Sequence, residues 1–353
     1  MPGGFDRFDT INILGFNAPE WFFSYLGAMT AGGVPVGIYA TNNAEACQYV
    51  SQHSRARVVV CDGLKQLEKY AQISQSLPHL KALVLYGADV LTDDWKSRFV
   101  IPVYSFEEFL EMGKQSNVPK TMLLERTKSW KPGHTATLIY TSGTTGPPKA
   151  VMTTNDNLTW TTATTLLKTP RGYMDHTDVM ISYLPLSHIA AQLIDIHCPL
   201  ASGCQIYFAQ PDALKGSLGT TLKQVRPTIF FAVPRVWEKI YEKLQQVGKE
   251  TTGVKKLIST WAKESAAEYW DANDFDELPN FWWARDVPAS YYMSKMILTQ
   301  VHEALGFDRC YGFYASAAPM ELKIFKYFAS LDIPIMEVFG QSEVRLSEHG
   351  VPQ

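Results

Sequence analysis

The 353-residue sequence lacks several features that would assign it to a specialised class of protein. Its cysteines are odd in number and scattered, without a C-x-x-C pair: Cys47, Cys61, Cys198, Cys204 and Cys310. This usage argues against a disulfide framework or a cysteine metal site and predicts free thiols in a reducing compartment. A net charge of −3 supplies no basic field for nucleic acid. The first ten residues lack the basic-then-apolar pattern of a signal peptide.

Long hydrophobic runs are also missing. The longest uncharged stretch, residues 21–44, contains four glycines and a proline and includes a strand-like V-P-V-G-I-Y segment. It is therefore interpreted as core and not as a membrane span. With 46% hydrophobic and 19% charged residues, the composition is that of a globular protein. We expect a soluble, cytoplasmic α/β protein, with peripheral contact with the endoplasmic reticulum or another lipid surface as an open alternative.

Short apolar segments alternate with helical patterns along the chain. Residues 11–16, 34–39, 56–62, 81–86, 204–210 and 333–340 read as strands. Residues 234–250 begin with Pro234 and carry apolar residues on one face, which predicts a helix. Ser105 and Glu108 have the spacing of a capping box. Strands that alternate with helices imply an α/β fold with largely parallel sheets covered by helices on both faces. Residues 270–292 show the least regular pattern.

The most informative segment is L-I-Y-T-S-G-T-T-G-P-P-K-A-V-M, residues 138–152. A glycine-rich turn after a buried strand can aim backbone N–H groups at an anion, and the hydroxyls and Lys149 add donors and charge. A Walker-type loop requires G-x-x-x-x-G-K-[ST], whereas here Pro148 precedes Lys149 and Ala150 follows it. An ordinary Ser/Thr/Gly hairpin loop is the alternative interpretation.

At these residues the sequence resembles the adenylate-forming superfamily of acyl-CoA synthetases, luciferases and peptide-synthetase adenylation domains. Residues 140–149 match the signature Y-T-S-G-[ST]-T-G-x-P-K, and Ala150 replaces the usual next glycine. L-P-L-S-H-I-A (184–190) is similar to the motif that borders the acyl pocket. Y-A-S-A-A-P-M (314–320) stands where the family has G-A-A-P against adenine, with Ser316 for glycine. E-V-F-G-Q-S-E-V (337–344) corresponds to Y-G-x-[ST]-E, with Phe339 for tyrosine.

Two further segments narrow the resemblance. V-P-R-V-W-E-K-I (233–240) looks like the long-chain fatty-acyl-CoA synthetases, and residues 13–50 look like their bubblegum-type members. The resemblance implies a first α/β subdomain over 1–130, and a second over 131–343 with the phosphate loop, acyl pocket and adenine motifs. A divergent tail follows over 344–353. It also predicts a chain shortened at both ends, without the family's small C-terminal domain and its catalytic lysine.

The resemblance implies an ATP site built by Thr141, Ser142, Gly143, Thr144, Thr145, Gly146, Pro147, Pro148, Lys149, Ala317, Ala318, Val338, Phe339, Gly340, Gln341, Ser342 and Glu343. Within this set, Lys149, Glu343 and Thr144 are the expected catalytic residues. Glu343 with Thr141 or Thr144 is the expected Mg²⁺ pair, and His188 borders the acyl pocket.

Several of these side chains have a structural alternative. Glu343 could be a solvated carboxylate and His188 a buried structural histidine. Asp195 and His197 resemble a polar pair, but such an isolated D-x-H within an apolar helix is more often structural. Trp282 and Trp283 could shape a lipid tunnel, although aromatic clusters are usually core.

The implied function is a long-chain fatty acid–CoA ligase that uses ATP, Mg²⁺ and coenzyme A and proceeds through an acyl-adenylate, impaired here by truncation. The alternative is a non-catalytic fragment that binds ATP or fatty acid, or pairs with a full-length synthetase. An aryl-CoA ligase or luciferase-like enzyme is a third interpretation, against which residues 233–240 argue. Nucleic acid is not an expected partner, and peripheral membrane contact is an open one.

Overall fold

The structure, a computed structural model, describes residues 4–141, 146–272 and 287–348. The chain forms two compact units. Unit 1 comprises Met1–Thr162 and Tyr183–His197, and unit 2 comprises Ala163–Ser182 and Cys198–Gln353. Within the described residues, no helix is long and apolar enough to cross a membrane.

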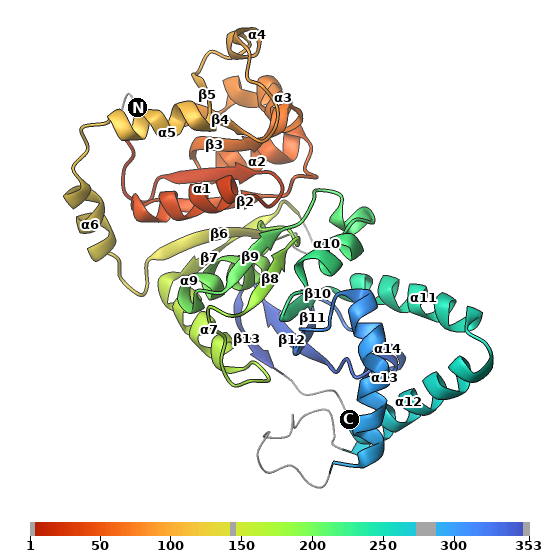
Figure 1. The fold of residues 1–353 in the computed structure, drawn as a ribbon. Helices are drawn as coiled ribbons and strands as arrows, with labels where there is room; N and C mark the ends of the chain where they lie inside the picture. The colour runs from red at the N-terminus through yellow and green to blue at the C-terminus, as the bar shows by residue number, and fades with distance from the viewer. Residues whose placement is uncertain (1–3, 142–145, 273–286, 349–353) are drawn as a thin grey trace. The chain divides into compact units, whose positions relative to one another are not determined.

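Unit 1 is built on a seven-stranded sheet (Figure 1). Its strands are β1 (Thr10–Leu14), β2 (Val34–Ile38), β3 (Ala56–Asp62), β4 (Ala82–Tyr86), β5 (Val103–Ser105), β6 (Thr135–Thr141) and β7 (Lys149–Thr154). Its helices are α1 (Pro19–Thr30), α2 (Ala44–His53), α3 (Gly63–Ile73), η1 (Ser74–Ser76), α4 (Asp93–Ser97), α5 (Phe106–Gln115), α6 (Lys120–Lys128), α8 (Ile189–Ala191) and the π-helix η2 (Gln192–His197); α7 (Asn155–Leu167) begins in unit 1 and ends in unit 2.

The strand order is β5-β4-β3-β1-β2-β6-β7. All neighbours pair in parallel except β6 and β7, which are antiparallel. Strands β2 and β4 are buried at every position, as expected of parallel strands covered on both faces. The predicted α/β class with largely parallel sheets is thereby confirmed. The predicted boundary near residue 130 falls between α6 and β6, and the sheet of unit 1 continues past it to β7.

The predicted capping box is present at the start of α5. The Ser105 hydroxyl accepts a hydrogen bond from the Glu108 backbone N–H at 3.1 Å, and the Glu108 carboxylate accepts one from the Ser105 N–H at 2.8 Å. These two local hydrogen bonds satisfy backbone donors at the helix start, where the sequence predicts them.

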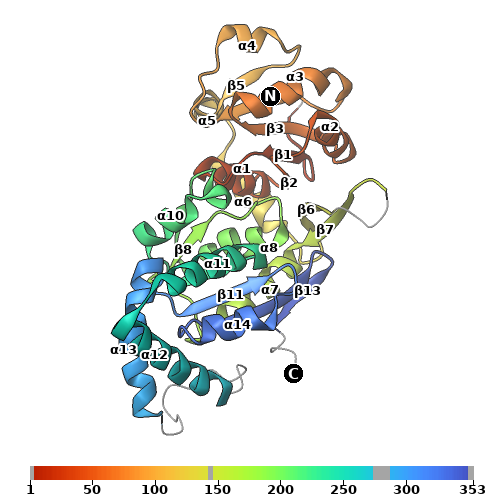
Figure 2. The same cartoon turned by 90° about the vertical axis from the view of Figure 1, so that its right-hand side faces the viewer.

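Unit 2 contains a four-stranded sheet of order β10-β11-β12-β13 and a two-stranded sheet of β8 and β9 (Figures 1 and 2). The strands are β8 (Val179–Ser182), β9 (Gln205–Phe208), β10 (Ile229–Ala232), β11 (Gly312–Ser316), β12 (Ile335–Gln341) and β13 (Val344–Glu348). The helices are α9 (Cys198–Ser202), η3 (Ala213–Lys215), α10 (Leu218–Val225), α11 (Pro234–Glu250), α12 (Gly253–Ala272), α13 (Ala289–Leu305) and α14 (Leu322–Ala329). Only β12 and β13 pair antiparallel.

The predicted helix over 234–250 is confirmed with its predicted bounds. Trp237 on this helix is fully buried, and its indole N–H donates to the Tyr314 carbonyl on β11 at 3.1 Å. The Trp237 ring also contacts the rings of Phe230 and Phe328, with centroids 5.2 and 5.0 Å away. A large aromatic side chain whose polar atom is hydrogen-bonded stabilises the packing of α11 on the sheet.

The region predicted as least regular, 270–292, is helical at both ends. Helix α12 extends to Ala272 and α13 begins at Ala289, which the sequence pattern did not indicate. Trp282 and Trp283, considered for a lipid tunnel, lie outside the described residues. The predicted divergent tail contributes β13 to the edge of the sheet.

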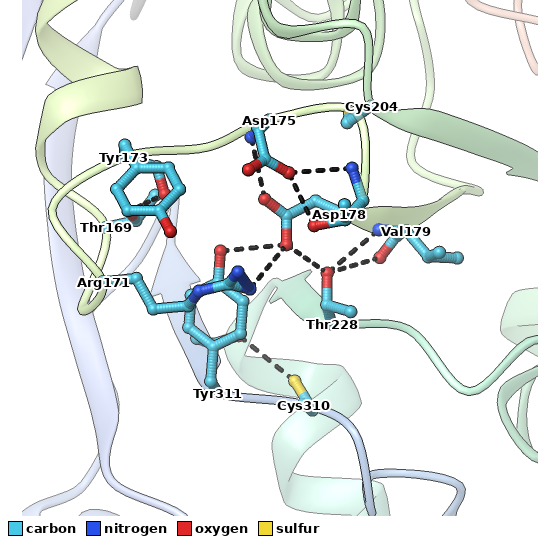
Figure 3. A network of polar contacts seen from close by, with 12 residues as sticks. Thr169, Arg171, Tyr173, Asp175, Asp178, Val179, Cys204, Thr228, Cys310 and Tyr311 are labelled. Carbon is cyan, nitrogen blue, oxygen red and sulfur yellow. Dashed lines mark hydrogen bonds and ion pairs between the residues drawn. The ribbon is translucent and has the colours of Figure 1, made fainter.

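A buried polar cluster fixes the loop before β8 (Figure 3). The fully buried Asp178 carboxylate accepts hydrogen bonds from the hydroxyls of Thr228 and Tyr311 at 2.8 and 3.0 Å and from the Asp175 backbone N–H at 3.0 Å. Arg171 forms an ion pair with it at 3.5 Å and lies over the Tyr311 ring. Burial, and the nearby charge of Asp178, raise the pKa of Tyr311. The buried carboxylate thus has several hydrogen-bond and ion-pair partners, as a buried charge requires.

Candidate functional site

The glycine-rich segment of unit 1 is the connection of the β6–β7 hairpin. The last paired residues are Thr141 on β6 and Lys149 on β7. Four members of the predicted phosphate loop, Ser142, Gly143, Thr144 and Thr145, lie outside the described residues. Gly146 has φ +82°, a left-handed conformation that favours glycine, and Lys149 is exposed at the start of β7. The structure therefore presents the Lys149 ammonium to solvent at the base of the loop.

Three aromatic rings brace this hairpin against α2. The Tyr49 hydroxyl donates to the carbonyl oxygen of Pro148 at 2.9 Å. A second hydrogen bond joins His53 Nδ1 and the Tyr140 hydroxyl at 2.8 Å. Tyr49 stacks on His53, with centroids 5.6 Å apart, and meets Tyr140 edge-on at 6.4 Å. Burial, with a smaller contribution from Tyr49, raises the pKa of Tyr140 to about 12, so its hydroxyl stays protonated at neutral pH.

Two of the three rings in this brace, those of Tyr49 and His53, were not selected by the sequence analysis. Tyr49 and His53 are four residues apart on α2, and this spacing places them on one helix face. Their partners Pro148 and Tyr140 are 99 and 87 residues away in the sequence. The helical spacing was the only available signal, and it does not identify the partners.

The L-P-L-S-H segment of unit 1 forms a turn that packs on β2. Gly37 approaches Ser187 so closely that a Cβ atom on Gly37 would lie 2.6 Å from the Ser187 Cα. The next residue, His188, caps the short helix α8, and its Nδ1 accepts a hydrogen bond from the Ala190 N–H at 3.2 Å. His188 is exposed to solvent, and desolvation by neighbouring protein atoms lowers its pKa. The exposed position of His188 does not match the alternative of a buried structural histidine, and its place beside an acyl pocket stays a prediction.

The D-x-H segment lies in the π-helix η2, where Asp195 is buried. His197 Nε2 forms a 3.1 Å hydrogen bond with the Tyr25 hydroxyl, and the two rings meet edge-on. Burial lowers the pKa of His197 to about 4, so the ring is neutral at physiological pH. Its environment is that of a core side chain, as the structural interpretation expects.

The predicted adenine motifs meet in unit 2 at the carboxyl ends of neighbouring strands. Ser316, the last residue of β11, pairs in parallel with Val338 on β12. Beyond this pair lie Ala317 and Ala318, in the turn that follows β11, and Phe339 on β12, and all three are exposed. The carboxyl ends of parallel strands are the usual ligand-binding edge of such sheets.

Ala317 adopts φ +82°, which L-residues with a side chain rarely do. A non-glycine residue in this region costs about 1–3 kcal/mol, and such strain concentrates at ligand sites.

Gly340 and Gln341 complete β12, and Ser342 and Glu343 form the turn into β13. Glu343 is exposed. Its carboxylate and the Thr141 hydroxyl are hard oxygen donors of the kind that Mg²⁺ prefers. No group of three or more His, Cys, Asp or Glu that could hold a metal occurs in the described ranges. Mg²⁺ usually completes its coordination with substrate oxygens and water.

Comparison with known proteins places these motifs in a family context. The family model described as AMP-binding enzyme matches residues 3–346. The chain is 45% identical over 343 residues to the long-chain-fatty-acid–CoA ligase ACSBG2 of Xenopus laevis, covering 96% of this chain and 44% of the relative. It is 42% identical to ACSBG2 of Homo sapiens, covering 96% and 49%. The chain thus spans about half the length of the curated relatives it matches.

Among solved structures, the A-PCP didomain of carboxylic acid reductase from Segniliparus rugosus in complex with AMP is similar, with a TM-score of 0.69 at 18% identity. The match covers 97% of this chain and 44% of that one. ATP-bound MatB from Rhodopseudomonas palustris matches with a TM-score of 0.58 at 17% identity, covering 97% and 52%. At these identities the likeness establishes the fold alone.

Proposed function

The chain belongs to the AMP-binding enzyme family, and we propose that it carries the ATP and acyl sites of a long-chain fatty acid–CoA ligase. The observation that carries the proposal is the exposed Lys149 at the base of a braced glycine-rich hairpin loop, in a chain 38–45% identical to ligases of that name. Membership of the family and the relatives' names support ATP as the nucleotide and a long-chain fatty acid as the acid.

The proposed reaction has two steps. The carboxylate of the fatty acid attacks the α-phosphorus of ATP, an acyl-adenylate forms and pyrophosphate leaves. The thiolate of coenzyme A then attacks the acyl carbon, a thioester forms and AMP leaves. Catalysis of the first step depends mainly on positioning and on neutralising charge on the phosphates.

In this proposal the phosphate loop of unit 1 binds the pyrophosphate end of ATP. The Lys149 ammonium offsets negative charge, and the backbone N–H groups and hydroxyls of residues 141–146 donate hydrogen bonds. Charge-assisted hydrogen bonds contribute about 1.5–3 kcal/mol each, so removal of Lys149 should weaken ATP binding by about 10- to 150-fold. The brace from Tyr49 holds the loop exit in place before ATP arrives, which reduces the entropy lost on binding.

The strand ends of unit 2 bind the nucleoside. The exposed ring of Phe339 stacks on adenine, and the Ala317–Ala318 backbone lies along its edge. Glu343 is a proposed protein donor to Mg²⁺, which, when bound, neutralises phosphate charge. His188 borders the proposed acyl site, and coenzyme A is the proposed second substrate.

The test is palmitate- and ATP-dependent release of pyrophosphate by the purified chain, with coenzyme A omitted and then added. We expect release that Lys149→Ala and Glu343→Ala reduce, and that Lys81→Ala, an exposed lysine on the same unit, leaves unchanged. ATP affinity is measured on the same variants by calorimetry. Binding of ATP without pyrophosphate release would identify a binding fragment of a ligase. Equal ATP affinity in Lys149→Ala and Lys81→Ala would contradict the proposed role of the loop.

A further inference from the structure

The end of α11 and the start of α12 form an exposed helical hairpin, which we call the hairpin tip and define as residues 243–261. Helix α11 ends at Glu250, α12 begins at Gly253, and only two residues join them. Figure 1 shows the two helices, in teal, joined at the ends that lie away from the sheet of unit 2. Burial along α11 follows this path, because Trp237 is fully buried whereas Val247 is 55% exposed.

An apolar stripe runs along the first turns of α12. Val254, Leu257, Ile258 and Trp261 recur at the spacing of one helix face, and their side chains are 70%, 72%, 45% and 39% exposed. The second half of α12 behaves differently, since Ala262, Ala266 and Trp270 are buried in unit 2. Within the part of the chain that the structure describes, the stripe is thus left open to solvent over about two helical turns.

Positive charge accompanies the stripe. The hairpin tip contains four exposed lysines, Lys243, Lys249, Lys255 and Lys256, and a single acidic residue, Glu250. Its net charge is +3 in a chain whose net charge is −3. Lys255 and Lys256 follow Val254 directly, and the 100° step of a helix places Lys255 beside the stripe and Lys256 on the opposite, polar face.

We propose that the hairpin tip docks on a lipid bilayer that carries anionic headgroups. An exposed apolar helix face with lysines beside it is the pattern of helices that lie in the membrane interface. The aliphatic stem of Lys255 can lie along the acyl boundary while its ammonium group reaches the headgroup phosphates, and Lys256 adds positive charge on the polar face. Trp261 is of the residue type that is enriched at that depth.

The charge distinguishes a lipid surface from a second copy of the chain. Pairing of two hairpin tips would bring +3 against +3, which costs Coulomb energy, whereas an anionic bilayer attracts the same lysines. Docking rests on the stripe and the charge alone. Its use, to meet a fatty acid that partitions into bilayers, rests on the proposed function.

The experiment is co-sedimentation of the purified chain with vesicles of phosphatidylcholine and with vesicles of a three-to-one mixture of phosphatidylcholine and phosphatidylserine. We expect binding to the mixed vesicles that added salt weakens. Lys255→Gln with Lys256→Gln should reduce binding to mixed vesicles by about 30-fold. Leu257→Gln with Ile258→Gln should reduce binding to them by about tenfold or more.

The controls are matched in type and exposure. Leu167→Gln with Leu322→Gln removes two exposed helical leucines elsewhere in the chain, and Lys65→Gln with Lys81→Gln removes two exposed lysines of unit 1. Both should bind mixed vesicles like the unchanged chain. Absence of vesicle binding by the unchanged chain, or equal binding by tip and control variants, would overturn the proposal. The proposal would also be overturned if Leu257→Gln with Ile258→Gln altered the oligomeric state of the chain but left its vesicle binding unchanged.

ATP affinity of every variant is measured in parallel. Retained ATP binding with no vesicle binding would refute docking while leaving the proposed function intact. Vesicle binding by a chain that does not bind ATP would refute the proposed function while supporting docking.

Discussion

The brace between Tyr49 and the phosphate loop leads to a specific prediction for the variant Tyr49→Phe. This change removes one hydroxyl and keeps the ring that stacks on His53 and meets Tyr140 edge-on. The lost hydrogen bond, 2.9 Å long, ends on the carbonyl of Pro148, directly before Lys149. A hydrogen bond of this kind contributes about 0.5–1.5 kcal/mol net.

If the bond mainly holds the loop in its binding conformation, that free energy appears in ATP affinity, which should fall by about 2- to 10-fold. The measurement is calorimetric titration with ATP, with thermal unfolding recorded alongside. Tyr104→Phe is the control, because the Tyr104 ring packs on Phe109 and, among the described residues, its hydroxyl has no hydrogen bond.

A double-mutant cycle with Lys149→Ala separates loop positioning from a general loss of stability. If Tyr49 acts by positioning Lys149, the Tyr49→Phe effect on ATP affinity should shrink when the lysine is already absent. Equal effects in both backgrounds would show that Tyr49 acts independently of Lys149. An ATP affinity of Tyr49→Phe equal to that of Tyr104→Phe would refute the positioning argument altogether.

Three further predictions concern stability. Burial lowers the pKa of His197 from 6.5 to about 4, so between these pH values the unfolded chain binds a proton that the folded chain does not. The free energy of unfolding should therefore fall, by up to about 3 kcal/mol, as the pH drops through this window, and His197→Gln should lose that component in denaturant titrations. Asp178→Asn removes the charge that faces Arg171 and should cost about 2–4 kcal/mol, measured by calorimetry. Gly37→Ala brings a Cβ within 2.6 Å of the Ser187 Cα and should cost about 1–3 kcal/mol in the same assay.

Each of these predictions has a control in the chain. His79→Gln, a change at an exposed histidine, should leave the pH dependence of the free energy of unfolding as it is in the unchanged chain. Asp175→Asn should cost less than Asp178→Asn, because Asp175 is outside the core and its carboxylate accepts only local hydrogen bonds from Thr177. Gly27→Ala, in helix α1 with no atom within 4 Å of the added Cβ, should stabilise by about 0.5–1 kcal/mol. A control that behaves like its test variant would contradict the structural reason given for that pair.

The sequence predicted much of the secondary structure, because short apolar strands and the amphipathic helix 234–250 follow their own periodicities. It predicted neither α12 nor α13. The residues of the candidate site were accessible through their motifs. The brace of Tyr49 and His53 was not, because it depends on contacts across 99 and 87 residues of sequence. The left-handed Ala317 was not predictable either, since alanine gives no signal for a positive φ.

Apolar periodicity predicts that a helix has a face to cover, but it does not say what covers it. Trp237 and Val247 belong to the same predicted face of α11, yet the first is fully buried and the second is 55% exposed. The face continues as the helix leaves the core, and α12 returns with a second exposed stripe. Exposed apolar surface of this kind marks an interaction site, because solvent alone gives no reason to retain it. The four lysines of the hairpin tip favour an anionic bilayer as the covering surface, because its headgroups attract positive charge.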